Sequence, residues 1–218
     1  MKATFILTSL ILLSYILIYL LDYFSLFSFE NIVKNFGFSF NNFFKRPYVL
    51  ITSIFIHGSI DHLISNLIAL IFFGIAVEDE IGAKKMLLIF FYGAFFGDIF
   101  SLFFYSPETI SIGASAGIFA LVGFGMIIRP LDISLYPPFY IIPLGLVGIL
   151  YTIYNIIGFI FNIGNISYIG HFAGLFAGLF AASRHRKWKK GIKMLSFLIF
   201  FTIFLWILLM IFKFYFYK

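Results

Sequence analysis

Seven long apolar segments follow one another along this chain of 218 residues. By hydropathy they lie near residues 3–21, 60–77, 85–105, 115–128, 139–160, 169–182 and 192–212. Backbone in the hydrocarbon layer of a membrane must satisfy its own hydrogen bonds, which helices of about 20 residues do. The first segment ends without a small-x-small cleavage pattern, so we expect it to be retained. The sequence therefore predicts an all-α integral membrane protein with several passes through the bilayer.

The composition excludes several classes of function. Hydrophobic residues make up 62% of the chain and charged residues 11%, whereas roughly a quarter of the residues in soluble domains are charged. The chain has no cysteine, so a disulfide framework, a thiolate metal site and a cysteine nucleophile are all excluded. The formal net charge is +6, but the basic residues crowd into residues 184–193 between two apolar segments. We therefore expect membrane lipid, and no nucleic acid, as the partner of these charges.

Lysine and arginine are divided unequally between alternate loops, which predicts the orientation of the chain. The side that holds the N-terminus would carry Lys2, Lys84, Lys85, Arg129, Arg184, Arg186, Lys187, Lys189, Lys190 and Lys193. The other side would carry Lys34, Lys45, Arg46, Lys213 and Lys218. Because basic residues favour the cytoplasmic side, we expect a cytoplasmic N-terminus in a cell membrane, with residues 184–193 as an anchor.

Two further features bear on the arrangement of the segments. The fourth and sixth segments are short and rich in Gly, Ala and Ser, so we expect them to pack closely at the centre of the bundle. Residues 23–46 carry many phenylalanines among several asparagines. This connection is too polar to span and too aromatic for a freely solvated loop, which favours a position in the membrane interface.

Three polar stretches interrupt the apolar sequence, at residues 57–66, 113–117 and 170–174. Polar side chains at membrane depth are costly and are more often functional than incidental. With a cytoplasmic N-terminus, all three stretches fall just below the outer surface. We therefore expect them to form one composite site.

Ser115 and His171 are the most informative residues of these stretches. A serine hydroxyl is a poor nucleophile until a base takes its proton, and an imidazole suits that role near neutral pH. Gly113 precedes the serine, and Gly174 and Gly178 follow the histidine at helical spacing, so both helices can approach a neighbour closely. The simpler interpretation is that the glycines serve only helix packing and that the serine hydroxyl bonds a carbonyl of its own helix. Packing alone does not require a serine on one face and a histidine beside the other.

His62 and Asn66 lie four residues apart and therefore on one helical face, where both can donate hydrogen bonds to an oxyanion. His57 is expected in the loop above them. A metal site built from His57, His62 and His171 is the competing interpretation, but no intramembrane carboxylate is clearly available to complete it. No acidic residue is placed to orient the base, and Asp98 is expected to bond backbone or water. We therefore expect a Ser-His dyad without a third member, a metal or a cofactor.

Over residues 46–182 these motifs resemble the rhomboid intramembrane serine proteases. The resemblance is carried by elements in the family's order: the approach from Arg46 to His57, then His57, His62 and Asn66, then Gly74, Glu78 and Gly82, then Gly113 and Ser115, and finally His171, Gly174 and Gly178. The resemblance implies that Ser115 is the nucleophile and His171 the general base. It also implies that His62, Asn66 and the Ser115 amide hold the oxyanion, with supporting roles for His57, Gly113, Phe119, Gly174 and Gly178.

The resemblance further implies a six-helix catalytic core over residues 1–183, followed by a basic linker and a seventh transmembrane helix over residues 184–218. Such an enzyme cleaves transmembrane protein substrates near the outer membrane face, with the fifth segment and residues 161–168 on the access side. Three positions depart from the family pattern: Ala116 replaces a glycine, Phe119 replaces a frequent tyrosine, and Lys45-Arg46 replaces a Trp-Arg pair.

Two other functions fit the sequence less well. Rhomboid-like pseudoproteases bind membrane proteins without cutting them, but such relatives typically lack the serine or the histidine, and both are present here. A small transporter would place its broken helices near the midplane of the membrane, whereas these motifs are expected near one surface.

Overall fold

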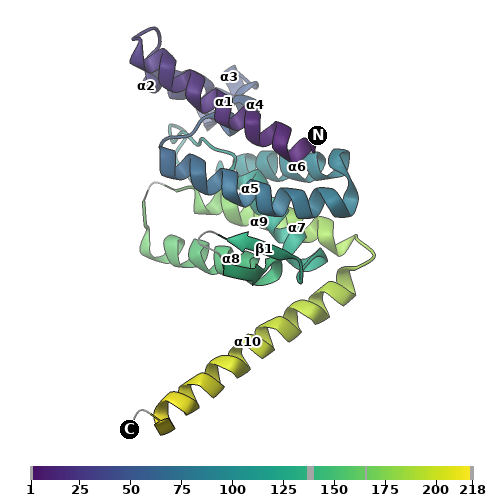
Figure 1. Ribbon diagram of the computed structural model, residues 1–218. Coiled ribbons are helices and arrows are strands. Elements are labelled where there is room, and N and C mark those ends of the chain that lie inside the picture. Colours follow the sequence, from purple (N-terminus) through teal and green to yellow (C-terminus); the bar gives the residue numbers. More distant parts are fainter. Residues whose placement is uncertain (1, 137–139, 165, 217–218) are drawn as a thin grey trace.

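The computed structural model describes residues 2–136, 140–164 and 166–216, and most of them are helical (Figure 1). Residue 139 and Lys218, which entered the sequence-based predictions, lie outside the described residues. Each of the seven apolar segments overlaps one long helix. These helices are α1 (Ala3–Tyr23), α5 (Ile60–Ile81), α6 (Ala83–Ser101), α7 (Ser115–Ile128), α8 (Leu144–Phe161), α9 (Tyr168–Ser183) and α10 (Trp188–Phe216).

Within the described residues, α1, α5, α8 and α10 are long and apolar enough to cross a membrane, by length and composition. Helices α7 and α9 are shorter and equally apolar. The chain is thus a predominantly helical integral membrane protein.

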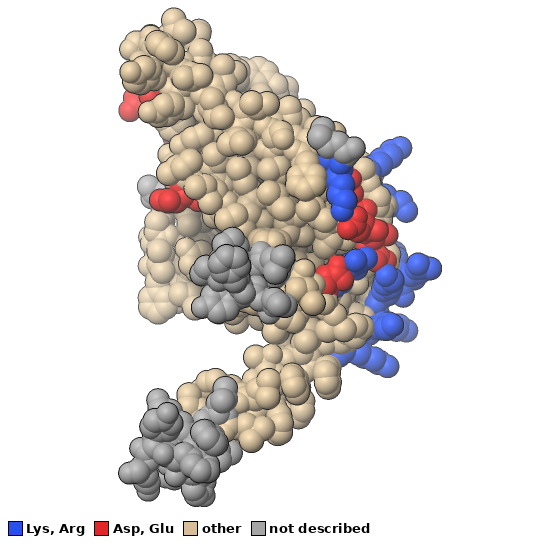
Figure 2. All heavy atoms as spheres, in the orientation of Figure 1, with Lys and Arg blue, Asp and Glu red and all other residues tan. Residues whose placement is uncertain are grey.

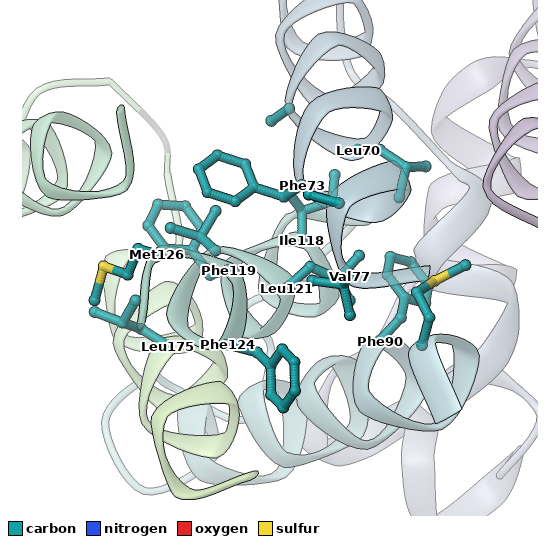
Figure 3. Packing of buried hydrophobic residues seen from close by; sticks show 14 of the residues in the cluster. Leu70, Phe73, Val77, Phe90, Ile118, Phe119, Leu121, Phe124, Met126 and Leu175 are labelled. Atoms are coloured by element: carbon teal, nitrogen blue, oxygen red, sulfur yellow. The ribbon is translucent and has the colours of Figure 1, made fainter. Parts of the chain in front are cut away.

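Helix α7 lies at the centre of the bundle, and every residue from Gly117 to Ile128 is buried. Figure 3 shows its side chains packed against those of α5, α6 and α9. Two glycines on α9 allow it to pack closely against α7. A Cβ atom at Gly174 would overlap the carbonyl oxygen of Ala116, and one at Gly178 would overlap that of Ala120. This arrangement agrees with the expected central position of the two short helices and fixes α9 beside the start of α7.

Residues 23–46 are folded on one another. They contain α2 (Phe29–Phe36) and α3 (Phe40–Lys45), and α4 (Val49–Thr52) and the 3₁₀ helix η1 (Ser53–Phe55) lead on to α5. The Asn42 side-chain amide donates to the carbonyl oxygens of Lys34 and Gly37, each at 2.9 Å. Phe38 pairs with Ser111 through two backbone hydrogen bonds. These bonds attach the segment to the loop that precedes Ser115.

The chain is mostly helical, as expected, but the start of the fifth segment differs from the prediction. Strands β1 (Ile133–Tyr136) and β2 (Tyr140–Pro143) form an antiparallel pair, and α8 begins only at Leu144. Pro143 has an extended backbone with ψ of 135°. A proline inside a helix removes a hydrogen bond and clashes with the carbonyl four residues earlier, so the helix begins after it. Hydropathy cannot distinguish such an apolar strand from the first turn of a helix.

Helix α10 leaves the bundle at an angle (Figure 1). Its first turns are packed, since Gly191 contacts the Ile127 backbone of α7 and Leu195 and Leu198 are buried. Most of the described side chains beyond Leu198 are exposed in this isolated chain. In a bilayer, lipid or another protein segment covers such a surface.

Candidate active site

A cavity of about 810 Å³ brings the three polar stretches together. Its walls come from α5, α7, α8 and the start of α9, and from the loops that precede α5, α7 and α9. The residues predicted for the site that line it are His62, Asn66, Ser115, Phe119 and His171.

Ser115 and His171 lie close together at the N-terminal ends of two helices. Ser115 is the first residue of α7, and His171 lies in the first turn of α9. The hydroxyl oxygen of Ser115 is 2.7 Å from Nε2 of His171. Residues 56 positions apart in sequence are therefore within hydrogen-bonding distance, so the hydroxyl can pass its proton directly to the imidazole.

The turn before Ser115 depends on Gly113. This glycine has a φ of +114°, a conformation that costs little only without a Cβ atom. A Cβ there would also lie 2.9 Å from Nε2 of His62. The Gly113 amide donates to the Ser53 carbonyl at 2.9 Å, which holds the turn against η1.

Asn155 contacts the other side of the imidazole and was not predicted from the sequence. The amide oxygen of Asn155, on α8, is 2.8 Å from Nδ1 of His171. The amide nitrogen of Asn155 faces the Tyr168 carbonyl at 3.5 Å, so its oxygen is the atom that accepts from the Nδ1 proton. The expectation of a dyad without a third member is therefore corrected. It was wrong because only Asp and Glu had been considered as partners of the imidazole. The sequence feature that could have indicated this residue is an asparagine within the fifth apolar segment.

Phe119 stacks on the face of His171, with ring centroids 4.5 Å apart and planes 13° apart. One turn separates Phe119 from Ser115, so the same helix carries the hydroxyl and the surface on which the imidazole rests. The contact restricts rotation of the ring between Ser115 and Asn155.

His62 and Asn66 line the same cavity as Ser115. The Asn66 amide nitrogen is buried and has no hydrogen-bond partner among the described residues. An unpaired buried donor is costly, and the residue that carries it borders the cavity. The Nε2 atom of His62 and the amide nitrogen of Asn66 both lie near the Gly113 backbone, within 4 Å of the position a Cβ would take.

His57 lies beside His62. It is buried, and its ring is 4.9 Å from the His62 ring, centroid to centroid. The competing metal site would need His57, His62 and His171 to share a ligand. Both ring nitrogens of His171 instead face Ser115 and Asn155, and the described residues contain no group of three potential His, Cys, Asp or Glu ligands. Asp98 lies outside the cavity and accepts from the Ser53 hydroxyl at 3.4 Å.

Comparisons with known proteins show the family of the chain. The Rhomboid domain family model matches residues 45–188. RHOMBOID-like protein 12, mitochondrial, of Arabidopsis thaliana is 31% identical over 180 residues, which are 74% of this chain and 53% of that protein. Rhomboid-like protease 3 of Toxoplasma gondii is 32% identical over 85 residues, 39% of this chain and 31% of that protein.

One relative carries a different description. The Inactive RHOMBOID-like protein 8 of Arabidopsis thaliana is 31% identical over 123 residues, which are 56% of this chain and 34% of that protein. The chain thus spans about half the length of the first of these relatives and about a third of the other two.

Proposed function

Because this chain belongs to the rhomboid family, we propose that it is an intramembrane serine endopeptidase with Ser115 as nucleophile and His171 as general base. The observation that carries the proposal is the 2.7 Å contact between the Ser115 hydroxyl and Nε2 of His171. Asn155 holds the opposite nitrogen of the same ring, so Nε2 keeps the lone pair that a base needs.

The reaction follows from these positions. The Ser115 oxygen attacks the carbonyl carbon of the scissile bond while its proton moves to Nε2 of His171. The resulting oxyanion accepts hydrogen bonds from His62, the Asn66 amide and the Ser115 backbone N–H. His171 then gives the proton to the leaving amine as the C–N bond breaks. The oxygen of a water molecule then attacks the acyl carbon while its proton moves to His171, and His171 returns that proton to the Ser115 oxygen as the ester C–O bond breaks and the carboxylic acid leaves.

Transmembrane protein segments are the proposed substrates. The cavity wall contributed by α8 contains Leu150, Tyr151 and Tyr154, and Ile166 continues it in the loop after α8. An apolar helix that unwinds beside α8 and residues 161–168 would reach Ser115 from the lipid. In this proposal, residues 1–183 form a six-helix catalytic core, and residues 184–218 add the basic linker and a seventh transmembrane helix.

The proposed orientation places the N-terminus in the cytoplasm and opens the cavity toward the outer side of a cell membrane. It rests on the distribution of Lys and Arg. The name of one relative refers to mitochondria, so the kind of membrane is a separate question that localisation of a tagged full-length chain would answer.

The test is cleavage in a bilayer. The purified protein in liposomes would be incubated with a panel of single-span membrane proteins, beside Ser115→Ala and His171→Ala. We expect cleavage by the parent and at least about a thousandfold loss in each variant. Ser65→Ala is the matched control, since Ser65 lines the same cavity but bonds to its own helix carbonyl at 3.0 Å. Cleavage that persists in Ser115→Ala would contradict the proposal.

A non-catalytic relative is the alternative outcome, as the name of one similar protein illustrates. A folded parent that captures single-span segments but cuts none of them would support that function. The same result would exclude proteolysis for the segments tested.

A further inference from the structure

A second cavity lies at the opposite end of α7 from Ser115. It has a volume of about 320 Å³ and is formed where α7 ends and α10 begins. Helix α7 has 14 residues, so the two sites are about 20 Å apart along its axis. The second cavity is lined by Ile128, Arg129, Pro130, Leu131, Asp132, Lys187, Lys190, Gly191 and Met194.

Cations outnumber the carboxylates around this cavity. Arg129 contacts Asp132 at 2.7 Å and Glu80 at 3.1 Å, and Lys187 contacts the same Glu80 at 2.6 Å. Lys190 is exposed on the cavity rim, and no hydrogen bond or ion pair joins its ammonium group to the described part of the chain. Two carboxylates therefore face three cations, and one cation is left for an external anion.

The position of the cavity indicates where that anion comes from. On the face shown in Figure 2, the visible Lys and Arg side chains gather at one end of the molecule, with Asp and Glu side chains among them, and the N-terminus lies toward the same end in Figure 1. Lys2 contacts Asp79 there at 2.8 Å. Because apolar surface covers most of the molecule away from this end, the charged end lies at a membrane surface.

The walls of the cavity are amphipathic. Ile128, Leu131 and Met194 present apolar surface, while Arg129, Lys187 and Lys190 supply positive charge. Trp188 begins α10 beside the cavity, and tryptophan favours the level of lipid headgroups. The N-terminus of a long helix adds a favourable potential for an anion.

From these features we propose that the cavity binds the phosphate headgroup of an anionic phospholipid, in the leaflet on the side of the chain's N-terminus. Lys190 pairs with the single negative charge of the phosphodiester, Arg129 and Lys187 stay paired with Asp132 and Glu80, and the apolar walls contact the glycerol and the first acyl carbons. The bound lipid would join the end of α7 to the start of α10. This site is independent of the proposed proteolysis.

Fluorescence quenching can test the proposal, because Trp188 and Trp206 are the two tryptophans of the chain. A Trp206→Phe protein leaves Trp188 as sole reporter. It would be placed in phosphatidylcholine vesicles that contain a small fraction of brominated phosphatidylglycerol or, in parallel, brominated phosphatidylcholine. We expect the anionic lipid to quench Trp188 about fivefold more strongly at equal fraction, the preference that one basic contact provides.

Variants distinguish a site from general attraction to a basic face. In the same background, Lys190→Gln should reduce the preference about fivefold, and Lys190→Arg should retain it. Lys193→Gln removes the same charge from an exposed position of α10 that does not line the cavity, and it should retain most of the preference. Equal quenching by the two lipids, or equal losses in the two glutamine variants, would overturn the proposal.

A final arm separates lipid from soluble phosphate. Inorganic phosphate at about 10 mM, compared with chloride at equal ionic strength, should leave the preference unchanged. Loss of the preference in phosphate alone would identify the free ion as the ligand and overturn the assignment to lipid.

Discussion

The amide oxygen of Asn155 and Nδ1 of His171 are 2.8 Å apart, on the side of the imidazole that faces away from Ser115. The contact joins α8 to α9, and it selects the ring tautomer in which Nε2 is the acceptor. Asn155 is 1% exposed, so water does not compete for its oxygen. Asn155 is therefore a positioning residue in the proposed reaction.

Asn155→Leu should lower kcat about tenfold and leave KM nearly unchanged, because one buried hydrogen bond of about 1–1.5 kcal/mol is lost at the base and not at the substrate. Cleavage kinetics in liposomes would measure both constants. Asn155→Asp keeps an acceptor oxygen and should restore most of kcat. Thr152→Ala, one turn earlier on α8, is the matched control, since its hydroxyl only bonds the Gly148 carbonyl. A loss equal in the leucine and aspartate variants would mean that Asn155 acts only through packing.

Asn66→Ala should lower kcat about a hundredfold or more, the effect of removing one oxyanion donor. Its amide nitrogen has no partner among the described residues, so the ground state loses no hydrogen bond from this donor, and we expect the fold to be retained. Single-turnover cleavage, with thermal unfolding as the check on folding, would test this expectation. If KM rises while kcat stays constant, Asn66 binds substrate and is no oxyanion donor.

The sequence was sufficient to predict the seven long helices because each is a sustained apolar segment, and four of them have the length that a bilayer requires. It was also sufficient to expect Ser115, His171, His62 and Asn66 in one site, because their polar stretches were predicted at one depth, and all four line one cavity. Strand β2 (Tyr140–Pro143) was missed because it continues the apolar run of the fifth segment directly into α8, and β1 falls in the connection before that segment. An apolar strand differs from an apolar helix in its backbone conformation, which hydropathy does not report.

Asn155 could not be assigned for a different reason. Its role depends on the rotation of α8 about its own axis, which decides whether the side chain faces lipid or His171. Packing against α7 and α9 sets that rotation, and contacts such as Gly148 with Met126 and Gly158 with Tyr168 are visible only in three dimensions.

Gly178→Ala should lower the free energy of unfolding by about 1–3 kcal/mol, a cost typical of overpacking. The added Cβ would overlap the backbone carbonyl of Ala120, which cannot move without shifting α7. Unfolding in mixed micelles would measure the change. Gly58→Ala provides the comparison, because its Cβ would meet its nearest atom at an ordinary 3.7 Å. Similar effects of the two alanines would show that the α7–α9 contact tolerates a methyl group.

Stability should also fall in mild acid because of His185, which lies between α9 and α10. Burial lowers the pKa of His185 below its ordinary value of 6.5. Its Nδ1 accepts from the Lys187 amide at 3.3 Å, and the ring packs edge-on against Phe124. Nε2 lies 3.6 Å from the Glu80 carboxylate, which raises the pKa, but burial and the nearby cations Lys187, Arg186 and Lys85 outweigh this effect.

The unfolded chain therefore binds a proton below about pH 6.5 that the folded chain takes up only at lower pH. This contribution to stability is complete above pH 6.5 and is lost as the pH falls toward the lowered pKa. The melting temperature in detergent should drop more between pH 7.5 and 5.5 for the parent than for His185→Gln, which has no group that titrates at this position. Since all carboxylates remain in both proteins, the difference between the two curves isolates His185. Parallel curves would mean that the folded chain protonates this ring as readily as the unfolded chain does.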